Sequence, residues 1–379
     1  MNGWVRHKEP TSFKCCLLRS SSNGTLVDDV KTEVRSYTYN IYTQWIVERQ
    51  NAEFSCSVSS TQITAIGKAN FSYVTFAKDS CLKAPVVVLP ILYPQPVPNS
   101  VCVCLKITYG NLKPEKVIEW FEYTRHMGTT KVFTYYAEVT TPVLKILQYY
   151  QSIGFLEMLP LEPVVSADGQ KISIAKPTFP QQAWVDEVMA ANDCKHRMAK
   201  YDFIIIMDMD EIIVPQGNMT SYFDILQAAS LKMPDVCGFS FDAHVVALTW
   251  GATRSSPLLI FRYTNRTDFV NYDGADRNTR WAFRPKMTYW VQNNLIHCRD
   301  SLKISPIPND TYTLLHYRSC KAQWTGCTEK TRVTDTSILK HELPLIDQIL
   351  AMPLRDLVSD YDTYISALTD WKRNITHKR

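Results

Sequence analysis

A run of apolar residues that ends abruptly in acids is the feature that most constrains this chain. Residues 203–207 read Phe-Ile-Ile-Ile-Met, and Asp208, Asp210 and Glu211 follow within four positions. Such a run is typical of a strand that is buried on both faces of a parallel sheet. The acids then fall at or just past the carboxyl end of the strand, where open α/β sheets bind their ligands. The pattern predicts an α/β fold with a functional site after this strand.

The spacing of these acids indicates a bound cation. Carboxylates as close as Asp208 and Asp210 repel one another and resist ionising together. Mg²⁺ or Mn²⁺ removes that cost, because both ions prefer carboxylate oxygens and commonly bridge a phosphate. The D-x-D arrangement therefore suggests a metal–nucleotide site, whereas a bare D-x-D taken alone is more often an acidic loop after a strand.

Strand-like and helix-like segments alternate around this motif. A β-α-β-α-β series before it implies a doubly wound, mostly parallel sheet with right-handed crossovers. The expected strands cover 101–107, 131–136, 155–161, 203–207 and 236–248, and the expected helices cover 114–127, 141–150, 181–198, 221–231, 338–352 and 354–373.

Composition shifts along the chain predict four parts. Residues 1–30 are serine-rich with few apolar positions, which favours disorder. Residues 31–98 form a β-rich section that ends in a proline-rich linker. Residues 99–335 form the main α/β domain, and residues 336–379 form C-terminal helices.

Charge and cysteine content limit the partners and the compartment. The net charge of +4 is too weak to argue for nucleic acid, and no nucleic-acid motif is visible. Eleven cysteines and six N-x-S/T sequons favour a secretory lumen. No signal segment and no apolar stretch of membrane-spanning length is found, so membrane attachment would need an anchor that this sequence does not show.

Several short stretches occur in an order that resembles glycosyltransferase family 92, a set of nucleotide-sugar-dependent transferases with a GT-A fold. The likeness covers about residues 100–320, and each stretch alone is weak. The matching stretches are Cys104 to Gly110, Glu119-Trp120-Phe121-Glu122 to Arg125 and Gly128, Ala191-Asn192-Asp193-Cys194 to Arg197, Asp208 to Glu211 with Val214-Pro215, Arg284-Pro285-Lys286, His297, and His316-Tyr317-Arg318.

The resemblance implies a metal site. Asp208 and Asp210 would hold Mn²⁺ or Mg²⁺, which would bridge the diphosphate of a nucleotide-sugar donor. A later histidine often completes the metal shell in GT-A enzymes; His316 is our choice and His297 is its rival. For a single histidine, a structural role is the ordinary alternative.

Further donor contacts are expected from residues in the matching stretches. Each has a simpler reading: a solvated cationic pair, a tight turn, or a capped helix end. The expected roles are donor phosphate binding for Arg284 and Lys286, base and ribose binding for Tyr109 and Gly110, and orientation of the metal loop for Asn192 and Asp193.

The general base is left open by the sequence. An inverting transferase needs a carboxylate to take the proton of the acceptor hydroxyl. Asp242, Asp273 and Asp276 lie in a suitable part of the chain, and Glu211 is a further candidate that also fits the metal shell. Nothing local separates them.

The expected activity is metal-dependent transfer of galactose from UDP-galactose, with inversion, to a glycan acceptor on a glycoprotein. The resemblance also implies a Golgi membrane protein that acts in the lumen. A catalytically inactive relative that binds glycans or nucleotide sugars is the alternative. An aspartyl phosphotransfer enzyme also ends a strand in D-x-D, but Glu211 directly after the second aspartate disfavours it.

Overall fold

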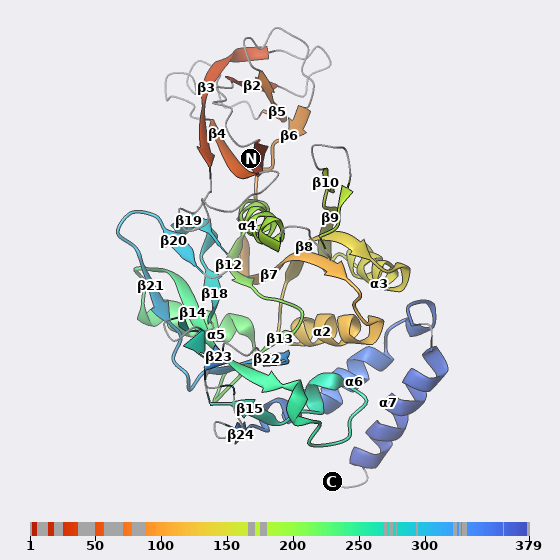
Figure 1. The fold of residues 1–379 in the computed structure, drawn as a ribbon. Coiled ribbons are helices and arrows are strands. Elements are labelled where there is room, and N and C mark those ends of the chain that lie inside the picture. The colour runs from red at the N-terminus through yellow and green to blue at the C-terminus, as the bar shows by residue number, and fades with distance from the viewer. Residues whose placement is uncertain are drawn as a thin grey trace. The chain divides into compact units, whose positions relative to one another are not determined.

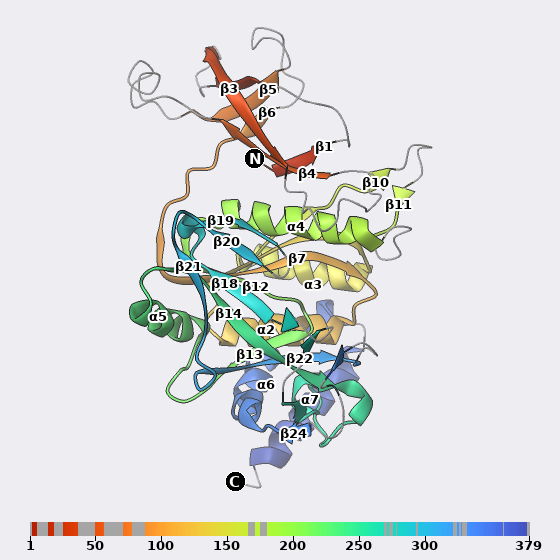
Figure 2. The ribbon, with the colours of Figure 1, turned by 60° about the vertical axis from the view of Figure 1, so that its left-hand side comes forward.

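We describe the chain from a computed structural model (Figures 1 and 2). Two compact units divide it: Met1–Gln95 with Pro163–Lys200, and Pro96–Glu162 with Tyr201–Arg379. The structure describes residues 2–5, 14–18, 26–36, 50–56, 71–77, 88–165, 171–174, 180–268, 271–272, 276–277, 279–292, 295–320, 324–325, 327, 332–358 and 360–376.

The first unit contains an antiparallel sheet of six strands. Their order is β1 (Asn2–Val5), β4 (Gln50–Cys56), β3 (Leu26–Ser36), β2 (Lys14–Leu18), β5 (Tyr73–Ala77) and β6 (Val88–Pro90). The hairpin of β10 (Val164–Val165) and β11 (Lys171–Ile172) and helix α4 (Pro180–Arg197) belong to the same unit.

Three of these strands differ from the expectation of disorder over residues 1–30. β1, β2 and the start of β3 lie in that range. Cys15 and Cys16 are fully buried and disulfide-bonded, and Leu17 packs with Phe71 and Phe76. Composition does not reveal such covalent ties, which is why a serine-rich segment was expected to be disordered.

The second unit is built on a mixed nine-stranded sheet. Its order is β13 (Glu211–Pro215), β22 (Tyr312–Arg318), β14 (Val236–Ala247), β18 (Thr279–Phe283), β12 (Tyr201–Ile206), β7 (Val97–Gly110), β8 (Lys131–Val139) and β9 (Leu156–Pro160), with β21 (Lys303–Pro306) beside β14.

The part of this sheet before the acids confirms the predicted β-α-β-α-β series. Strands β12, β7, β8 and β9 are parallel neighbours. Helix α2 (Pro114–His126) connects β7 to β8, and α3 (Thr141–Ser152) connects β8 to β9. A proline occupies the first turn of each helix, where its missing N–H costs nothing.

Beyond β12 the sheet is mixed, because β18 runs antiparallel to both β12 and β14. β14 and β22 are parallel, while β13 and β22 are antiparallel. The shorter elements in this part are β15 (Asn265–Thr267), β16 (Asn271–Tyr272), β17 (Asp276–Arg277), β19 (Thr288–Val291), β20 (Ile296–Cys298), β23 (Trp324–Thr325) and β24 (Arg332–Thr334).

Helices cover one face of the sheet and form the main core with it. Alternate residues of the central strands, such as Val101, Val103 and Ile205, share a buried cluster with the apolar faces of the helices. Besides α2 and α3, these helices are α5 (Tyr222–Lys232), α6 (Glu342–Leu350) and α7 (Tyr361–Thr376). α6 packs against α2, and α7 against α6 (Figures 1 and 2).

The fold is therefore the expected α/β class, with a mixed central sheet, flanking helices and a small β-rich N-terminal section. The expected C-terminal helices form as α6 and α7, and they share the core of the second unit. Within the described residues, none of the helices has the length and apolar character needed to span a membrane.

Candidate active site

Residues 207–210 form a short turn between β12 and β13, and five backbone contacts hold it in place. The Met207 amide donates to the Cys104 carbonyl, and the Glu211 amide donates to the Asp208 carbonyl. The Asp208 amide donates to Glu211 Oε2 at 2.9 Å. The Asp210 and Glu211 carbonyls accept from the Tyr317 amide at 2.7 Å and from Trp120 Nε1 at 3.0 Å. The motif is thus pinned to β7, β22 and α2.

The pairing of β13 with β22 places His316 directly opposite Glu211. Both side chains are buried, whereas the side chain of Asp210 is 43% exposed. His316 Nε2 lies 3.2 Å from Asp210 Oδ2, and Nδ1 lies 3.5 Å from Glu211 Oε1. The histidine chosen from the sequence is therefore the one that joins the acids.

The rival histidine lies elsewhere. His297 is in β20, where its ring stacks on Trp290 with centroids 4.3 Å apart. Its strand neighbour Cys298 is bonded to Cys237, at the other end of β14 from the acids.

Arg280, which the sequence reasoning did not single out, enters the cluster from β18. Its Nε donates to Glu211 Oε2 at 2.7 Å, and its NH2 group pairs with Glu211 Oε1 and, at 3.5 Å, with Asp208 Oδ2. Burial by itself would lower the pKa of Arg280, but Glu211 and Asp208 outweigh it and raise this pKa. Arg280 thus stays charged and neutralises two neighbouring acids.

Lys106 was also missed. Its Nζ lies 3.1 Å from Asp208 Oδ1. Partial burial by itself would raise the pKa of Asp208, but Lys106 and Arg280 outweigh it and hold this pKa well below its usual range. A lysine inside the apolar run 101–107 was the available signal, because a lysine is almost never buried without a partner.

Three of the residues at this site offer ligand atoms for one cation. Atoms of Asp210, Glu211 and His316 all lie within 4.8 Å of one another. Two carboxylates and an imidazole suit Mn²⁺, which accepts both oxygen and nitrogen ligands. Asp208, the other metal ligand predicted from the sequence, lies in the same cluster but pairs with Lys106 and Arg280.

The Glu-Trp-Phe-Glu stretch of α2 supports this site from behind. Trp120 holds the Glu211 carbonyl, as described above. Glu119 accepts hydrogen bonds from the amides of Leu259 and Ile260, and the Ile260 carbonyl in turn accepts from Tyr317 Oη. Burial raises the pKa of Glu119 to about 7 against these amide contacts. This stretch is structural.

The candidates for the general base lie in different surroundings. Glu211 is fully buried, and both of its oxygens contact Arg280. Asp242 is half-buried on β14, three residues before Val245, which pairs with His316. Asp276 lies in β17, but its side chain is outside the described residues, as is all of Asp273.

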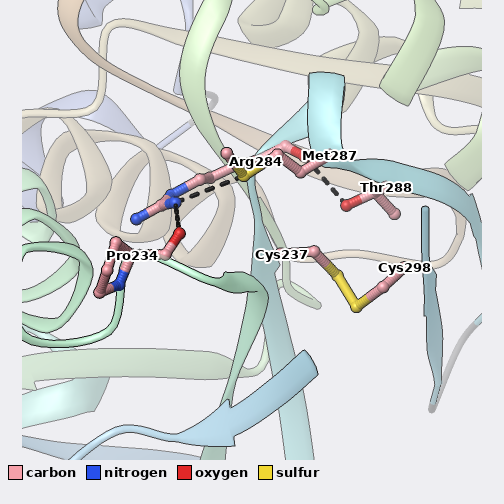
Figure 3. Close-up of a disulfide and its surroundings, with 6 residues drawn as sticks. All are labelled: Pro234, Cys237, Arg284, Met287, Thr288 and Cys298. Carbon is pink, nitrogen blue, oxygen red and sulfur yellow. Dashed lines mark hydrogen bonds between the residues drawn. A yellow bond between two sulfur atoms is a disulfide. The ribbon is translucent and has the colours of Figure 1, made fainter. Parts of the chain in front are cut away.

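Arg284 does not reach the acidic cluster. Its guanidinium donates to the carbonyls of Ser230 and Pro234, at and just beyond the C-terminal turn of α5, at 3.3 and 2.8 Å. Figure 3 shows this group with Pro234 and Met287, and the same view includes the Cys237–Cys298 disulfide. Lys286 is exposed in the next short helix. Arg284 lies at the opposite end of β18 from Arg280, and the expected phosphate contacts of Arg284 and Lys286 stay a prediction.

The other residues expected to contact the donor lie in β7 and in α4. Tyr109 and Gly110 end β7, and Gly110 has a φ of +85°, which favours glycine at this turn. Asn192 donates to the Val188 carbonyl within α4, and Asp193 pairs with Arg197. Since α4 belongs to the first unit, a role of these two residues in orienting the metal loop stays a prediction.

The family model of glycosyltransferase family 92 matches residues 99–349, well over half of the chain. The chain belongs to glycosyltransferase family 92. The resemblance drawn from the ordered motifs is thereby confirmed, and the protein is a glycosyltransferase. No curated protein matches the sequence.

Solved structures of low similarity accompany this family match. TarS 1–349 from S. aureus in complex with UDP has 13% identity and a TM-score of 0.32, covering 71% of this chain and 70% of that one. The same protein with UDP-GlcNAc has 12% identity and a TM-score of 0.30, covering 71% of each chain. HddC from Yersinia pseudotuberculosis has 9% identity and a TM-score of 0.28, covering 59% of this chain and 92% of that one. At these scores the likenesses add nothing to the family membership.

Proposed function

We propose that this family 92 member is a metal-dependent transferase that moves galactose from UDP-galactose, with inversion, to a glycan acceptor on a protein. The observation that carries the proposal is the convergence of Asp210, Glu211 and His316 after β12, with ligand atoms within 4.8 Å of one another. These residues would hold Mn²⁺ or Mg²⁺.

The charges of the cluster support a cation and a diphosphate as joint ligands. Among the described residues, and leaving His316 aside, the charged side chains that meet here sum to zero: Asp208, Asp210 and Glu211 against Lys106, Arg280 and Arg318. A divalent cation and the doubly charged diphosphate of a nucleotide sugar also sum to zero. The pair can therefore enter together without leaving net charge in a partly buried site, which would be costly.

The chemistry follows from this arrangement. When bound, the metal supplies a positive charge that offsets the charge developing on the leaving nucleoside diphosphate. Asp210 and Asp208, with side chains 43% and 35% exposed, form the accessible side of the cluster. Glu211 and His316 lie behind them and fix the ligand positions.

Asp242 is the base that we propose for the acceptor hydroxyl. Glu211 is ill suited to accept that proton, because it is buried and its oxygens contact Arg280. Asp242 is half-buried and lies about 10 Å along β14 from the level of His316, at about 3.3 Å per residue.

Disulfide bonds support a lumenal location such as the Golgi. Eight described cysteines are disulfide-bonded: Cys15, Cys16, Cys104, Cys194, Cys237, Cys298, Cys320 and Cys327. Bonds of this kind persist in oxidising compartments. Galactose as the donor sugar and the glycoprotein acceptor rest on the family membership.

Donor hydrolysis and glycan transfer with UDP-galactose and Mn²⁺ test the proposal, using the intact chain and Asp210→Ala. We expect metal-dependent turnover that falls at least about 1000-fold in the variant, since a ligand is lost. Asp356→Asn is the control, because this carboxylate is exposed on the surface. A wild-type protein that binds UDP only with Mn²⁺ yet turns over no UDP-sugar would instead be the inactive binding relative.

A further inference from the structure

The two aspartates of the motif have different surroundings. The carboxylate of Asp208 contacts two cations, Lys106 at 3.1 Å and Arg280 at 3.5 Å. The carboxylate of Asp210 contacts the imidazole of His316 at 3.2 Å. Residues two apart in a turn thus point at unlike partners, which indicates unlike roles.

Lys106 is held in an unusual place. Its residue is only 7% exposed, and its φ of +57° lies in the left-handed region, at a point where the pairing of β7 with β8 shifts register between Cys104 and Ile107. Non-glycine residues in this region persist where the surrounding structure enforces them, often at functional sites. Here the bulge directs a lysine toward the carboxyl end of β12.

Arg280 contacts Asp208 and Glu211, the two acids of the motif that are less exposed than Asp210. It contacts both oxygens of Glu211 and one oxygen of Asp208. Asp208 is therefore the point at which Lys106 and Arg280 meet. If Asp208 moved onto a metal, its ion pair with the buried ammonium of Lys106 would be broken, which is costly for a buried cation.

We propose that Asp208 is a positioning residue and not a metal ligand. It holds Lys106 and Arg280 beside the ligand set of Asp210, Glu211 and His316, and the two cations form the subsite for the diphosphate of the donor. This inference rests on the proposed function and refines it, because it assigns the metal and the diphosphate to different residues of one cluster.

Mn²⁺ binding without nucleotide separates the two aspartates. Electron paramagnetic resonance of Mn²⁺ titrated into Asp210→Asn should show affinity weakened at least about 100-fold, since a ligand is lost. Asp208→Asn should stay within about fivefold of wild type, because the backbone amide that bonds Glu211 remains. Asp202→Asn, the same change at the amino end of β12, is the matched control.

UDP binding to the Mn²⁺-saturated protein tests the subsite. Calorimetry should show UDP affinity weakened about tenfold or more in Asp208→Asn and in Lys106→Gln, and unchanged in Asp202→Asn. Lys106→Arg keeps the charge and should recover part of the loss. Thermal melts of each variant confirm that the comparison is between folded proteins.

Two results would overturn the inference while leaving the proposed function intact. One is loss of Mn²⁺ binding in Asp208→Asn as large as in Asp210→Asn. The other is wild-type UDP affinity in both Asp208→Asn and Lys106→Gln. Wild-type protein that binds neither Mn²⁺ nor UDP would overturn the proposed function itself, and the inference with it.

Discussion

Arg280 and Arg284 lie near the two ends of β18, and their guanidinium groups meet different surroundings. Arg280 faces Glu211 and Asp208 at the carboxyl end of β12. Arg284 lies about 13 Å further along the strand and binds carbonyls at the end of α5, next to a disulfide. The same side chain serves charge neutralisation at one end and helix termination at the other. The position of each arginine along β18 therefore decides its role, and substitutions of Arg280 and Arg284 should differ in their effects on stability and activity.

The largest effect is expected from Arg280→Met. The change leaves Glu211 buried without its cation, so the free energy of unfolding should fall by about 3–5 kcal/mol, and turnover should be lost. Urea denaturation with the disulfides intact measures the stability. Arg280→Lys keeps a positive charge but loses the bidentate contact. Its free energy of unfolding should therefore lie between those of the wild type and Arg280→Met. If Arg280→Met were as stable as the wild type, the proposed difference between the two ends of β18 would be wrong.

The disulfide at the Arg284 end should contribute stability without activity. Cys237→Ala with Cys298→Ala should lower the free energy of unfolding by about 2–4 kcal/mol, because the bond joins residues 61 apart and constrains the unfolded chain. Replacing Cys320 and Cys327, which are 7 apart, should cost less. Mn²⁺ affinity should be unchanged in the first variant; a large drop there would show that the two ends are coupled.

Glu119 shows what happens to a buried carboxylate that amides hold in place of an arginine. Its pKa is raised to about 7 from 4.5, so between these values the folded state binds more protons than the unfolded state. The contribution of Glu119 to stability is therefore fully present below pH 4.5 and is lost as pH rises through 7, by up to about 3 kcal/mol.

Chemical denaturation across pH 4–8 measures this dependence, with Glu119→Gln as the comparison. The variant has no carboxyl proton to exchange, so its stability should change less with pH over this window, although it loses one acceptor for the Leu259 and Ile260 amides. Equal pH slopes in both proteins would contradict the assignment.

The smallest effect is expected from Arg284→Met. The α5 carbonyls would lose donors near the protein surface, which costs about 1–2 kcal/mol. Turnover and UDP affinity should stay within about threefold of wild type, since no acid of the cluster contacts Arg284 in the described structure. A loss of UDP affinity comparable to that of Lys106→Gln would restore the phosphate role first expected for Arg284.

Local patterns carried most of the fold prediction. The apolar run before Asp208, the helix starting at Pro114 and the helix ending near Gly154 were all recognisable, because burial and turn chemistry repeat at short range. The direction of β18 was not, since alternation along a strand carries no information about the neighbours to which it pairs. The expected parallel pairing is continuous from β12 to β9 and returns where β14 pairs with β21 and β22, but antiparallel strands interrupt it.

The candidate site, like the fold, could be predicted from the sequence only in part. Asp208, Asp210, Glu211 and His316 could be picked from the sequence and do converge. Arg280 could not be told apart from Arg277 or Arg284, because the segment is uniformly arginine-rich. Only the pairing of β18 with β12 and β14 brings Arg280 to the acids and leaves Arg284 at the far end.

The sequence by itself determined the class of fold, the place of the acids at the end of a buried strand, and the family. These depend on side-chain order along one segment at a time. Only the tertiary structure decided which cations pair with the acids. The strand pairing that brings Lys106, Asp208 and Arg280 together joins residues that are far apart in the chain. Charge neutralisation is a property of distance in space, and the sequence order of these three residues does not contain it.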